Sequence, residues 1–260
     1  MTDTRADSRG GTAEKPFDLT FPAGEPGEYD QDEEFCEIVI DGETRRIRFH
    51  DYDEIFKIPG LYEQLFYAEM ECDSPRTIAG LIGEQVDNDT ASELRVLDVG
   101  AGNGMVGEEL DRMGAAHIVG VDIIPEAAEA AERDRPGVYD DYFVVDLTDV
   151  PTGELARMEA HKFNCLTTVA ALGFGDIPPE AFTTAFNLVE NGGLVAFNIK
   201  ERFVTDGDRT GFEDLISTAL DDGTLELEAQ RRYRHRLDVA GHPLYYIAMV
   251  ARKRADLPTA

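Results

Sequence analysis

Hydrophobic positions in residues 93–199 form short runs that alternate with stretches of helical periodicity. Short apolar runs predict strands, and apolar residues three and four positions apart predict helices. The alternation indicates a mostly parallel sheet with helices on both faces. The expected strands are Arg95–Val99, Ile118–Asp122, Tyr142–Val145, Phe163–Val169 and Leu194–Ile199, and the expected helices are Gly104–Met113, Pro125–Glu132, Gly153–Ala160 and Pro179–Leu188.

The pattern changes near the C-terminus. A further helix is expected around Phe212–Leu220, followed by two long strand-like segments, Leu225–Leu237 and Leu244–Arg252. The connection between these segments, Val239–Pro243, contains Gly241, so we expect them to pair as an antiparallel hairpin at one sheet edge. The expected fold is therefore α/β, with a doubly wound, seven-stranded sheet.

The chain ahead of this sheet is expected to form a small extension. Phe35–Ile40 and Arg45–Phe49 are β-like runs on either side of Asp41-Gly42, a dipeptide that favours the positive φ of a hairpin turn. A helical stretch, Leu61–Met70, follows, and Ser74-Pro75 has the composition of a helix cap and first turn.

Composition divides the chain further. Residues 1–34 are rich in Asp, Glu, Gly, Pro, Ser and Thr and carry few apolar side chains. Such a segment buries too little surface to offset the entropy of ordering, so we expect a disordered acidic tail. The extension then covers residues 35–90 and the main domain residues 91–254.

Charge narrows the classes of partner. The 260 residues include 53 acidic and 24 basic side chains, which gives a formal net charge of −29. An acidic surface argues against nucleic acid as a partner, because affinity for a phosphate backbone comes from basic residues. The same acidic excess is typical of proteins from a salt-rich cytoplasm, so salt adaptation is one hypothesis.

The sequence also bears on location and metal binding. No apolar run approaches the roughly 20 residues that a membrane span needs, and the N-terminus lacks the apolar core of a signal peptide. We therefore expect a cytoplasmic protein with no membrane partner. Cys36, Cys72 and Cys165 are far apart, which favours neither a disulfide framework nor a zinc site, so no metal is expected.

The clearest chemical signal lies just after the strand Arg95–Val99. That strand runs into Gly100, Gly102 and Gly104 and then into a predicted helix. Glycine permits positive φ and close approach of the backbone to a ligand, and a helix N-terminus offers free N–H groups to an anion. The segment therefore predicts a site for a nucleotide-like cofactor.

Two cofactors fit this loop. The spacing Gly102-x-Gly104-x-x-Gly107, with Asp122 ending the next strand, matches the dinucleotide fingerprint and so favours NAD. However, Asp98 lies two residues before Gly100, and a carboxylate there suits a ligand ammonium better than a phosphate.

At this point the sequence resembles the class I S-adenosylmethionine-dependent methyltransferases. Their first motif, acidic-x-Gly-x-Gly-x-Gly, is matched by Asp98, Gly100, Gly102 and Gly104. The resemblance runs from about Asp89 to Lys253 and includes the late antiparallel hairpin. It implies a Rossmann-like fold and S-adenosylmethionine as the cofactor.

The resemblance also implies individual roles. Asp98 is expected near the cofactor's amino group, and Asp122 on the ribose hydroxyls, since a carboxylate can accept two hydrogen bonds. Ile123 is expected to pack on adenine, and Asp146 to meet the adenine amino group beside the Leu147 N–H. The full set of expected cofactor-binding residues is Asp98, Gly100, Ala101, Gly102, Asn103, Gly104, Asp122, Ile123, Asp146, Leu147 and Ala170.

The methyl acceptor is less defined. Methyl transfer is an in-line displacement, so an enzyme mainly positions the acceptor and supplies a base only where a proton must leave. Glu201 and Arg202 lie beyond a strand end and are candidate substrate contacts, and His50 is a candidate base. No Asn/Asp-Pro-Pro-Tyr signature is present, which argues against the amino groups of nucleic acid and favours a small-molecule acceptor.

One basic run interrupts the acidic chain. Arg231–Arg236 would form part of a strand, with Arg232, Arg234 and Arg236 on one face. We expect a solvated edge strand, because charges on an edge discourage edge-to-edge aggregation. A binding site for an acidic substrate or RNA is the alternative for this run.

Three functions therefore stay open at this stage. The leading hypothesis is an S-adenosylmethionine-dependent methyltransferase acting on a small molecule. The second is an NAD-dependent oxidoreductase with a Rossmann domain. The third is a non-catalytic protein that kept the cofactor loop.

Overall fold

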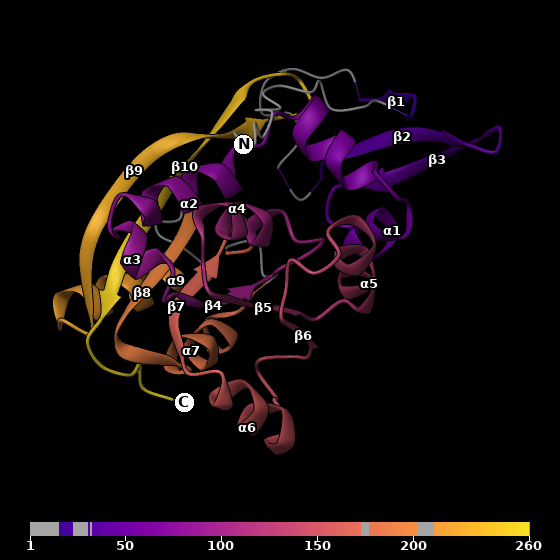
Figure 1. The fold of residues 1–260 in the computed structure, drawn as a ribbon. Coiled ribbons are helices and arrows are strands. Elements are labelled where there is room, and N and C mark those ends of the chain that lie inside the picture. Colours follow the sequence, from indigo (N-terminus) through magenta and orange to yellow (C-terminus); the bar gives the residue numbers. More distant parts are fainter. Residues whose placement is uncertain (1–15, 23–30, 32, 173–176, 202–210, 260) are drawn as a thin grey trace, which may run out of the picture.

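The computed structural model describes residues 16–22, 31, 33–172, 177–201 and 211–259. Among these, seven strands form one sheet in the order β6-β5-β4-β7-β8-β10-β9 (Figure 1). The first five in this order are parallel, whereas β10 runs antiparallel to both β8 and β9. The expected doubly wound sheet with an antiparallel C-terminal hairpin is therefore confirmed. The strands are β4 (Arg95–Val99), β5 (His117–Asp122), β6 (Asp141–Val144), β7 (Phe163–Thr168), β8 (Val189–Lys200), β9 (Leu225–Leu237) and β10 (Pro243–Lys253).

Each face of the sheet has its own apolar layer. In β4, Leu97 and Val99 belong to one buried cluster while Val96 belongs to another, as side-chain alternation along a strand requires. Helices α6, α7 and α9 contribute to the first cluster, and α2 and α4 to the second. The helices around the sheet are α2 (Ser74–Gly83), α3 (Asn88–Ala91), α4 (Met105–Met113), α5 (Pro125–Asp134), α6 (Thr152–Ala160), α7 (Pro179–Asn187) and α9 (Phe212–Asp221).

The extension has a core of its own. It consists of a three-stranded antiparallel sheet, β1 (Leu19–Thr20), β2 (Phe35–Ile40) and β3 (Glu43–Arg48), followed by α1 (Tyr52–Lys57) and the π-helix η1 (Glu63–Glu69). The predicted hairpin turn is present, since Asp41 and Gly42 have φ of 54° and 81°. In Figure 1 the extension lies at one end of the main sheet, next to α5.

Two expectations about the N-terminal part need correction. Leu19 pairs with Ile38, and the side chains of Phe17 and Phe21 pack on the extension core, so residues 16–22 are structured and not a disordered tail. Gln31 and Glu34 of the predicted tail are also buried, and residues 1–15, 23–30 and 32 lie outside the described residues. Helix α2 packs in a cluster of the main sheet, so the extension ends before Ser74 and not at residue 90.

Ser74 is not a helix cap. It is the first residue of α2, the residue at the cap position is Asp73, and neither makes a side-chain capping bond there. The Ser74 hydroxyl lies 2.6 Å from the Tyr233 hydroxyl and 2.6 Å from His235 Nδ1 on β9. A long-range polar contact has replaced the local one that the sequence suggests.

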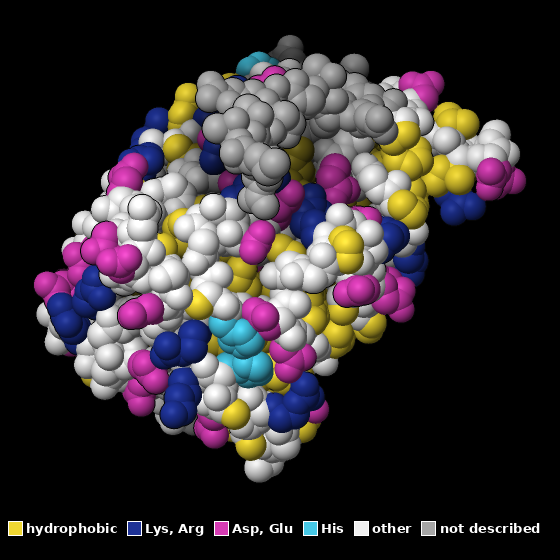
Figure 2. All heavy atoms as spheres, in the orientation of Figure 1, with side chains coloured by type: hydrophobic (Ala, Val, Ile, Leu, Met, Phe, Trp, Pro, Cys, Tyr) yellow, Lys and Arg dark blue, Asp and Glu magenta, His cyan; other side chains and the backbone are white. Residues whose placement is uncertain are grey.

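Acidic and basic side chains are interspersed on the face shown in Figure 2. Ion pairs between such side chains on the described surface include Arg231 with Glu84 and Arg252 with Glu228. Exposed pairs of this kind stabilise a protein by at most about 1 kcal/mol each. Within the described residues, no helix combines the length and the apolar character needed to cross a membrane.

Candidate active site

A cavity of about 310 Å³ lies at the carboxyl ends of the central strands. The strand order reverses between β4 and β7, and ligands of open α/β sheets bind at such a switch point. One wall follows the strands β4, β5, β6 and β7, and includes Gly100, Ala101, Gly102, Asn103, Asp122, Ile123, Asp146, Leu147 and Ala170. Further lining residues come from the extension and the C-terminal hairpin, and include Phe49, His50, Tyr52, Phe56, Tyr62, Phe66, Tyr67, His235, Arg236 and Tyr246.

The glycine loop needs glycine for two physical reasons. Gly100, Gly102 and Gly104 have φ of 72°, 53° and 90°, a region that L side chains rarely adopt. A Cβ on Gly100 would also lie 2.9 Å from the Cβ of Ala171. The loop can therefore keep this shape and pack this closely only without side chains at these positions.

Ala170 lines the cavity after β7, in a backbone conformation that is unusual for alanine. Its φ is 57°, and its N–H donates to Asn198 Oδ1 at 2.6 Å. A buried acceptor on β8 thus holds the turn after β7 in place.

Asp122 lines the cavity at the end of β5 with a fixed carboxylate. Oδ2 accepts from the Gly102 N–H at 2.9 Å, and Oδ1 accepts from the Ile124 N–H at 3.1 Å. Burial raises the pKa of this carboxyl above its ordinary value. Each oxygen retains acceptor capacity for a ligand hydroxyl. Beside it, Ile123 is 59% exposed, an apolar surface on the same wall.

The Asp98 carboxylate is turned away from the cavity. It is buried and accepts hydrogen bonds from Thr167 Oγ1 at 2.7 Å and from the Tyr139 hydroxyl at 2.8 Å. Burial raises its pKa to about 6. Asp98 is absent from the described residues that line the cavity, so the expected direct contact with the cofactor's amino group lacks geometric support.

Asn103 is the buried side chain of the loop that does line the cavity. Its Nδ2 donates to Glu63 Oε1 at 2.6 Å and to Asp134 Oδ2 at 3.2 Å. Its Oδ1 is buried and has no donor among the described residues. An unpaired buried acceptor is costly, so this oxygen marks a place where a ligand donor fits.

Asp146 and Leu147 follow β6 on the same wall. The Asp146 carboxylate is exposed, and its Oδ1 accepts from the Thr148 hydroxyl at 2.7 Å and from the Thr148 N–H at 2.8 Å. These bonds lower the pKa of the carboxyl. Leu147 is buried and lines the cavity beside it.

The three candidates for the acceptor side differ in position. His50 lines the cavity, and its ring lies 5.7 Å from the ring of Tyr52. Glu201 is paired with Arg232, Nε to Oε1 2.9 Å, outside the cavity lining. Arg202 lies outside the described residues. The cavity thus brings together His50 and the loop, and leaves Glu201 apart from them.

His235 and Arg236 are functional candidates that the sequence pattern missed. They were expected on opposite faces of a solvated strand, yet both are buried in the cavity wall. The register against β10 shifts between Leu244 and Tyr245, and such a bulge places an extra residue in one strand and redirects its side chains. The prediction of a wholly solvated basic strand is therefore wrong at these two residues.

His235 is held in a polar cluster. Its Nδ1 contacts Ser74 Oγ at 2.6 Å, and its ring stacks on Tyr246 with centroids 4.1 Å apart. Burial, together with the charges of Arg236 and Lys200, holds the pKa of this imidazole well below its usual value. His235 is therefore neutral at neutral pH. Its neighbour Arg236 is neutralised by a buried ion pair with Glu34.

These residues fit the cofactor that the sequence suggests. A nucleoside with an amino-acid tail needs acceptors for two ribose hydroxyls, an apolar surface for the base and an acceptor for the ammonium. The Asp122 carboxylate has acceptors of the first kind, and the exposed Ile123 side chain is an apolar surface of the second kind. The unpaired Asn103 Oδ1 is an acceptor of the kind that an ammonium group needs.

Comparison with known proteins agrees with this fit. A family model described as a methyltransferase domain matches residues 70–245. The ubiquinone biosynthesis O-methyltransferase of Neisseria meningitidis serogroup C is 29% identical over 104 residues, 40% of this chain and 43% of that protein. The protein of the same name from Nitrosococcus oceani is 28% identical over 153 residues, 58% of this chain and 63% of that protein. The matches thus span less than two thirds of these relatives.

One solved structure shows the same fold, and a second also matches part of the chain. An S-adenosylmethionine-dependent methyltransferase from Clostridium acetobutylicum matches with a TM-score of 0.50 and 14% identity, over 75% of this chain and 97% of that one. Magnesium protoporphyrin IX methyltransferase from Synechocystis, solved with S-adenosylmethionine bound, matches with a TM-score of 0.47 and 16% identity. The match covers 70% of this chain and 79% of that one. Because the family model covers more than half of the chain, this protein belongs to the class I S-adenosylmethionine-dependent methyltransferases and uses S-adenosylmethionine as its cofactor.

Proposed function

We propose that this methyltransferase acts on a small, ring-containing molecule and methylates one of its hydroxyl oxygens. The observation that carries the proposal is the aromatic wall, by which we mean the rings of Tyr52, Phe56, Tyr62 and Phe66. Successive ring centroids in this wall lie 6.1, 5.1 and 4.8 Å apart. Aromatic surfaces of this size favour flat apolar ligands. The relatives' name, O-methyltransferase, supports oxygen as the acceptor atom.

The chemistry divides between the cofactor and the protein. When bound, S-adenosylmethionine would supply a methyl group on a sulfonium sulfur. The acceptor oxygen would attack this methyl group in line, and S-adenosylhomocysteine would be the leaving group. The protein's part is to hold the acceptor, exclude water and accept the hydroxyl proton. The roles we propose for Gly100, Asp122, Ile123 and Leu147 concern cofactor binding alone, because these residues lie at or just after the carboxyl ends of β4, β5 and β6.

We assign the proton acceptor to His235. With its hydrogen on Nδ1, the imidazole donates to Ser74 Oγ and leaves the Nε2 lone pair free for the hydroxyl proton. Its depressed pKa keeps the ring neutral, which a base requires. Nε2 would take the hydroxyl proton as the acceptor oxygen becomes methylated. His50, on the same cavity wall, is the second candidate for this role.

The net charge supports a small-molecule substrate, and the free cysteines support a location in the cytoplasm. The net charge of −29 opposes binding to a nucleic-acid backbone, so we favour a small molecule. The three cysteines are unpaired, as is usual in the reducing cytoplasm, which is where we place the enzyme.

The test is transfer of a tritiated methyl group from S-adenosylmethionine to fractionated cell extract. We expect label in the small-molecule fraction, on compounds that carry a hydroxyl on a ring. Label confined to protein or RNA would contradict the proposal. The acceptor found in this way then serves for the assays of the variants below.

His235→Gln should lower kcat by about 10²–10⁴-fold on that acceptor, the range for loss of a general base, while His50→Gln should retain activity. In the unmodified enzyme, kcat/KM should stay high below pH 6.5, because the depressed pKa of His235 keeps it neutral there. Loss of activity in His50→Gln alone would move the base to His50. Binding of S-adenosylhomocysteine should be unchanged in both variants.

A further inference from the structure

We propose that Asn103 Oδ1 accepts a hydrogen bond from the α-ammonium group of S-adenosylmethionine, and that Glu63 of the extension is the positioning residue that aims it. The inference rests on the cofactor of this enzyme and is independent of the proposed acceptor. It also gives the ammonium a partner other than Asp98, whose carboxylate is occupied by Thr167 and Tyr139.

The orientation of the Asn103 amide is fixed by its neighbours. Glu63 Oε1 lies 2.6 Å and Asp134 Oδ2 lies 3.2 Å from the same amide nitrogen. Carboxylate oxygens accept hydrogen bonds and cannot donate them, so the NH₂ group must face the two acids. The oxygen of the amide therefore points away from them, and Asn103 lines the cavity.

This oxygen is prepared to bind a cation. Asn103 is 1% exposed, and no donor to its Oδ1 exists in the described part of the chain. An amide whose N–H groups donate to carboxylates is polarised, which strengthens its oxygen as an acceptor. A hydrogen bond from an ammonium would satisfy this acceptor and would be of the stronger, charge-assisted kind.

The order of the strands shows which end of the cofactor meets Asn103. Asp122, the expected partner of the ribose, is the last residue of β5, and Asp146, the expected partner of the adenine amino group, follows β6. Asn103 follows β4, the next strand on the other side of β5. A cofactor that lies along these strand ends therefore places its amino-acid tail at Asn103.

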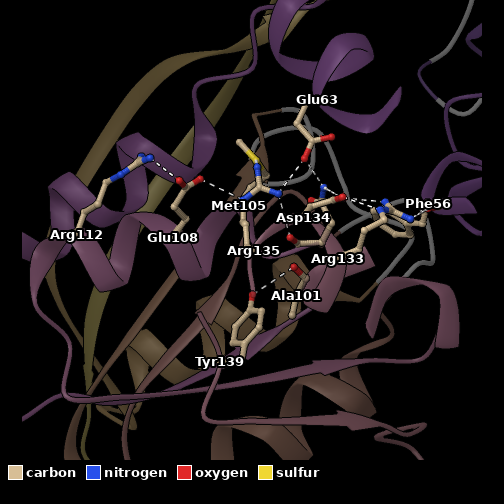
Figure 3. Close-up of polar contacts among 11 residues, drawn as sticks. Phe56, Glu63, Ala101, Met105, Glu108, Arg112, Arg133, Asp134, Arg135 and Tyr139 are labelled. Atoms are coloured by element: carbon tan, nitrogen blue, oxygen red, sulfur yellow. Dashed lines mark hydrogen bonds and ion pairs between the residues drawn. The ribbon is translucent and has the colours of Figure 1, made fainter. Parts of the chain in front are cut away.

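Glu63 connects this site to the extension. It belongs to η1, and its Oε1 also accepts from Arg135 Nη1 at 2.8 Å. Figure 3 shows the Arg135 guanidinium between the carboxylates of Glu63 and Glu108. The Arg135 Nη1 in turn donates to the Asn103 carbonyl at 3.1 Å, so the backbone and side chain of Asn103 are both held by this network.

The experiment compares two ligands by calorimetric titration. S-adenosylhomocysteine carries the ammonium group, and 5′-methylthioadenosine has the same nucleoside and thioether sulfur but no amino-acid tail. Asn103→Ala should weaken S-adenosylhomocysteine binding by about 10–100-fold, the scale of a charged hydrogen bond, and change 5′-methylthioadenosine binding less than about twofold. Glu63→Gln should give a smaller loss, about 3–10-fold, with the same selectivity.

Glu108→Gln is the matched control. Glu108 also pairs with Arg135, Nε to Oε2 3.1 Å, but within the described residues it makes no hydrogen bond with the Asn103 side chain, so both ligands should bind to this variant as they do to the unmodified protein. The ratio of the two affinities is the decisive quantity, because partial unfolding of a variant would weaken both ligands equally.

Each possible outcome of the titrations tests a different part of the proposal. A loss in Asn103→Ala that is equal for the two ligands, or no loss for either, would overturn the ammonium role. If the ratio of the two affinities in Glu63→Gln equalled that in the unmodified protein, the positioning role of Glu63 would be overturned. If the unmodified protein bound neither ligand, the assignment of the site itself would fall, whereas a failed search for the acceptor would leave this result untouched.

Discussion

Asp122 is the side chain on which cofactor affinity should depend most directly. Its two oxygens are held by the Gly102 and Ile124 N–H groups, so the carboxylate is presented without further ordering cost. Asp122→Ala should weaken S-adenosylhomocysteine binding by about 1–3 kcal/mol, the scale for a lost charged partner. Titration calorimetry measures this directly, and unchanged affinity would refute the ribose role.

Gly100 should be more sensitive to substitution than other glycines with positive φ. Gly42, in the hairpin turn, has φ of 81° and open space where a Cβ would lie, whereas a Cβ on Gly100 meets Ala171 at 2.9 Å. Gly42→Ala should therefore lower the free energy of unfolding by about 1–2 kcal/mol through strain alone. Gly100→Ala should lower it further. Urea unfolding of both variants provides the comparison, and equal losses would show that the close contact is relieved without cost.

Individual site residues differ in how far sequence alone could place them. Asp122 and the loop glycines follow from local spacing, since a strand end and a helix start fix where they lie. The surroundings of Asn103 and His235 depend on Glu63 and Ser74, which are far away in the chain. No local pattern carries such contacts, so the pairing of these residues emerged only in the structure.

At the scale of elements, the bulge in β9 has an effect on stability as well as on the site. It buries His235, and the pKa of this group is held well below 6.5 in the folded protein. A depressed histidine pKa leaves stability intact above the unfolded value of about 6.5, and stability falls as the pH drops from there toward the folded pKa.

The free energy of unfolding should therefore fall more steeply with acidification in the unmodified protein than in His235→Gln. The difference in slope below pH 6.5 should approach about 1.4 kcal/mol per pH unit, the value for one proton. Denaturant titrations between pH 5 and 8 measure it. Asp98, whose pKa is raised to about 6, acts in the opposite direction, but it is common to both proteins and cancels in the comparison. Parallel curves would contradict a buried neutral His235.

Most strands and helices of the sheet domain could be predicted because their apolar runs and periodicity are local properties. The failures involve contacts between elements. The expected helix at Leu61–Met70 is a π-helix over Glu63–Glu69, and β1 is a two-residue strand that depends on pairing with β2. The bulge in β9 breaks the alternation that placed Arg236 on the solvent face.

For the whole molecule, the net charge of −29 predicts a dependence on salt. Self-repulsion of the acidic surface lowers stability, and raising the salt from 0.1 to 1 M shortens the screening length from about 10 to 3 Å. The melting temperature should rise by several degrees in KCl. An equal rise in sorbitol of matched osmolality would indicate exclusion of solute and not screening. A melting temperature that ignores KCl would contradict salt adaptation.

The family model and the aromatic wall occupy different parts of the chain. The family model begins at residue 70, whereas the aromatic wall comes from residues 52–66. The matched segment contains the glycine loop and Asp122, and the rings lie outside it. If these rings hold the acceptor as we propose, substitutions in the extension should change which molecule is methylated while the source of the methyl group stays the same.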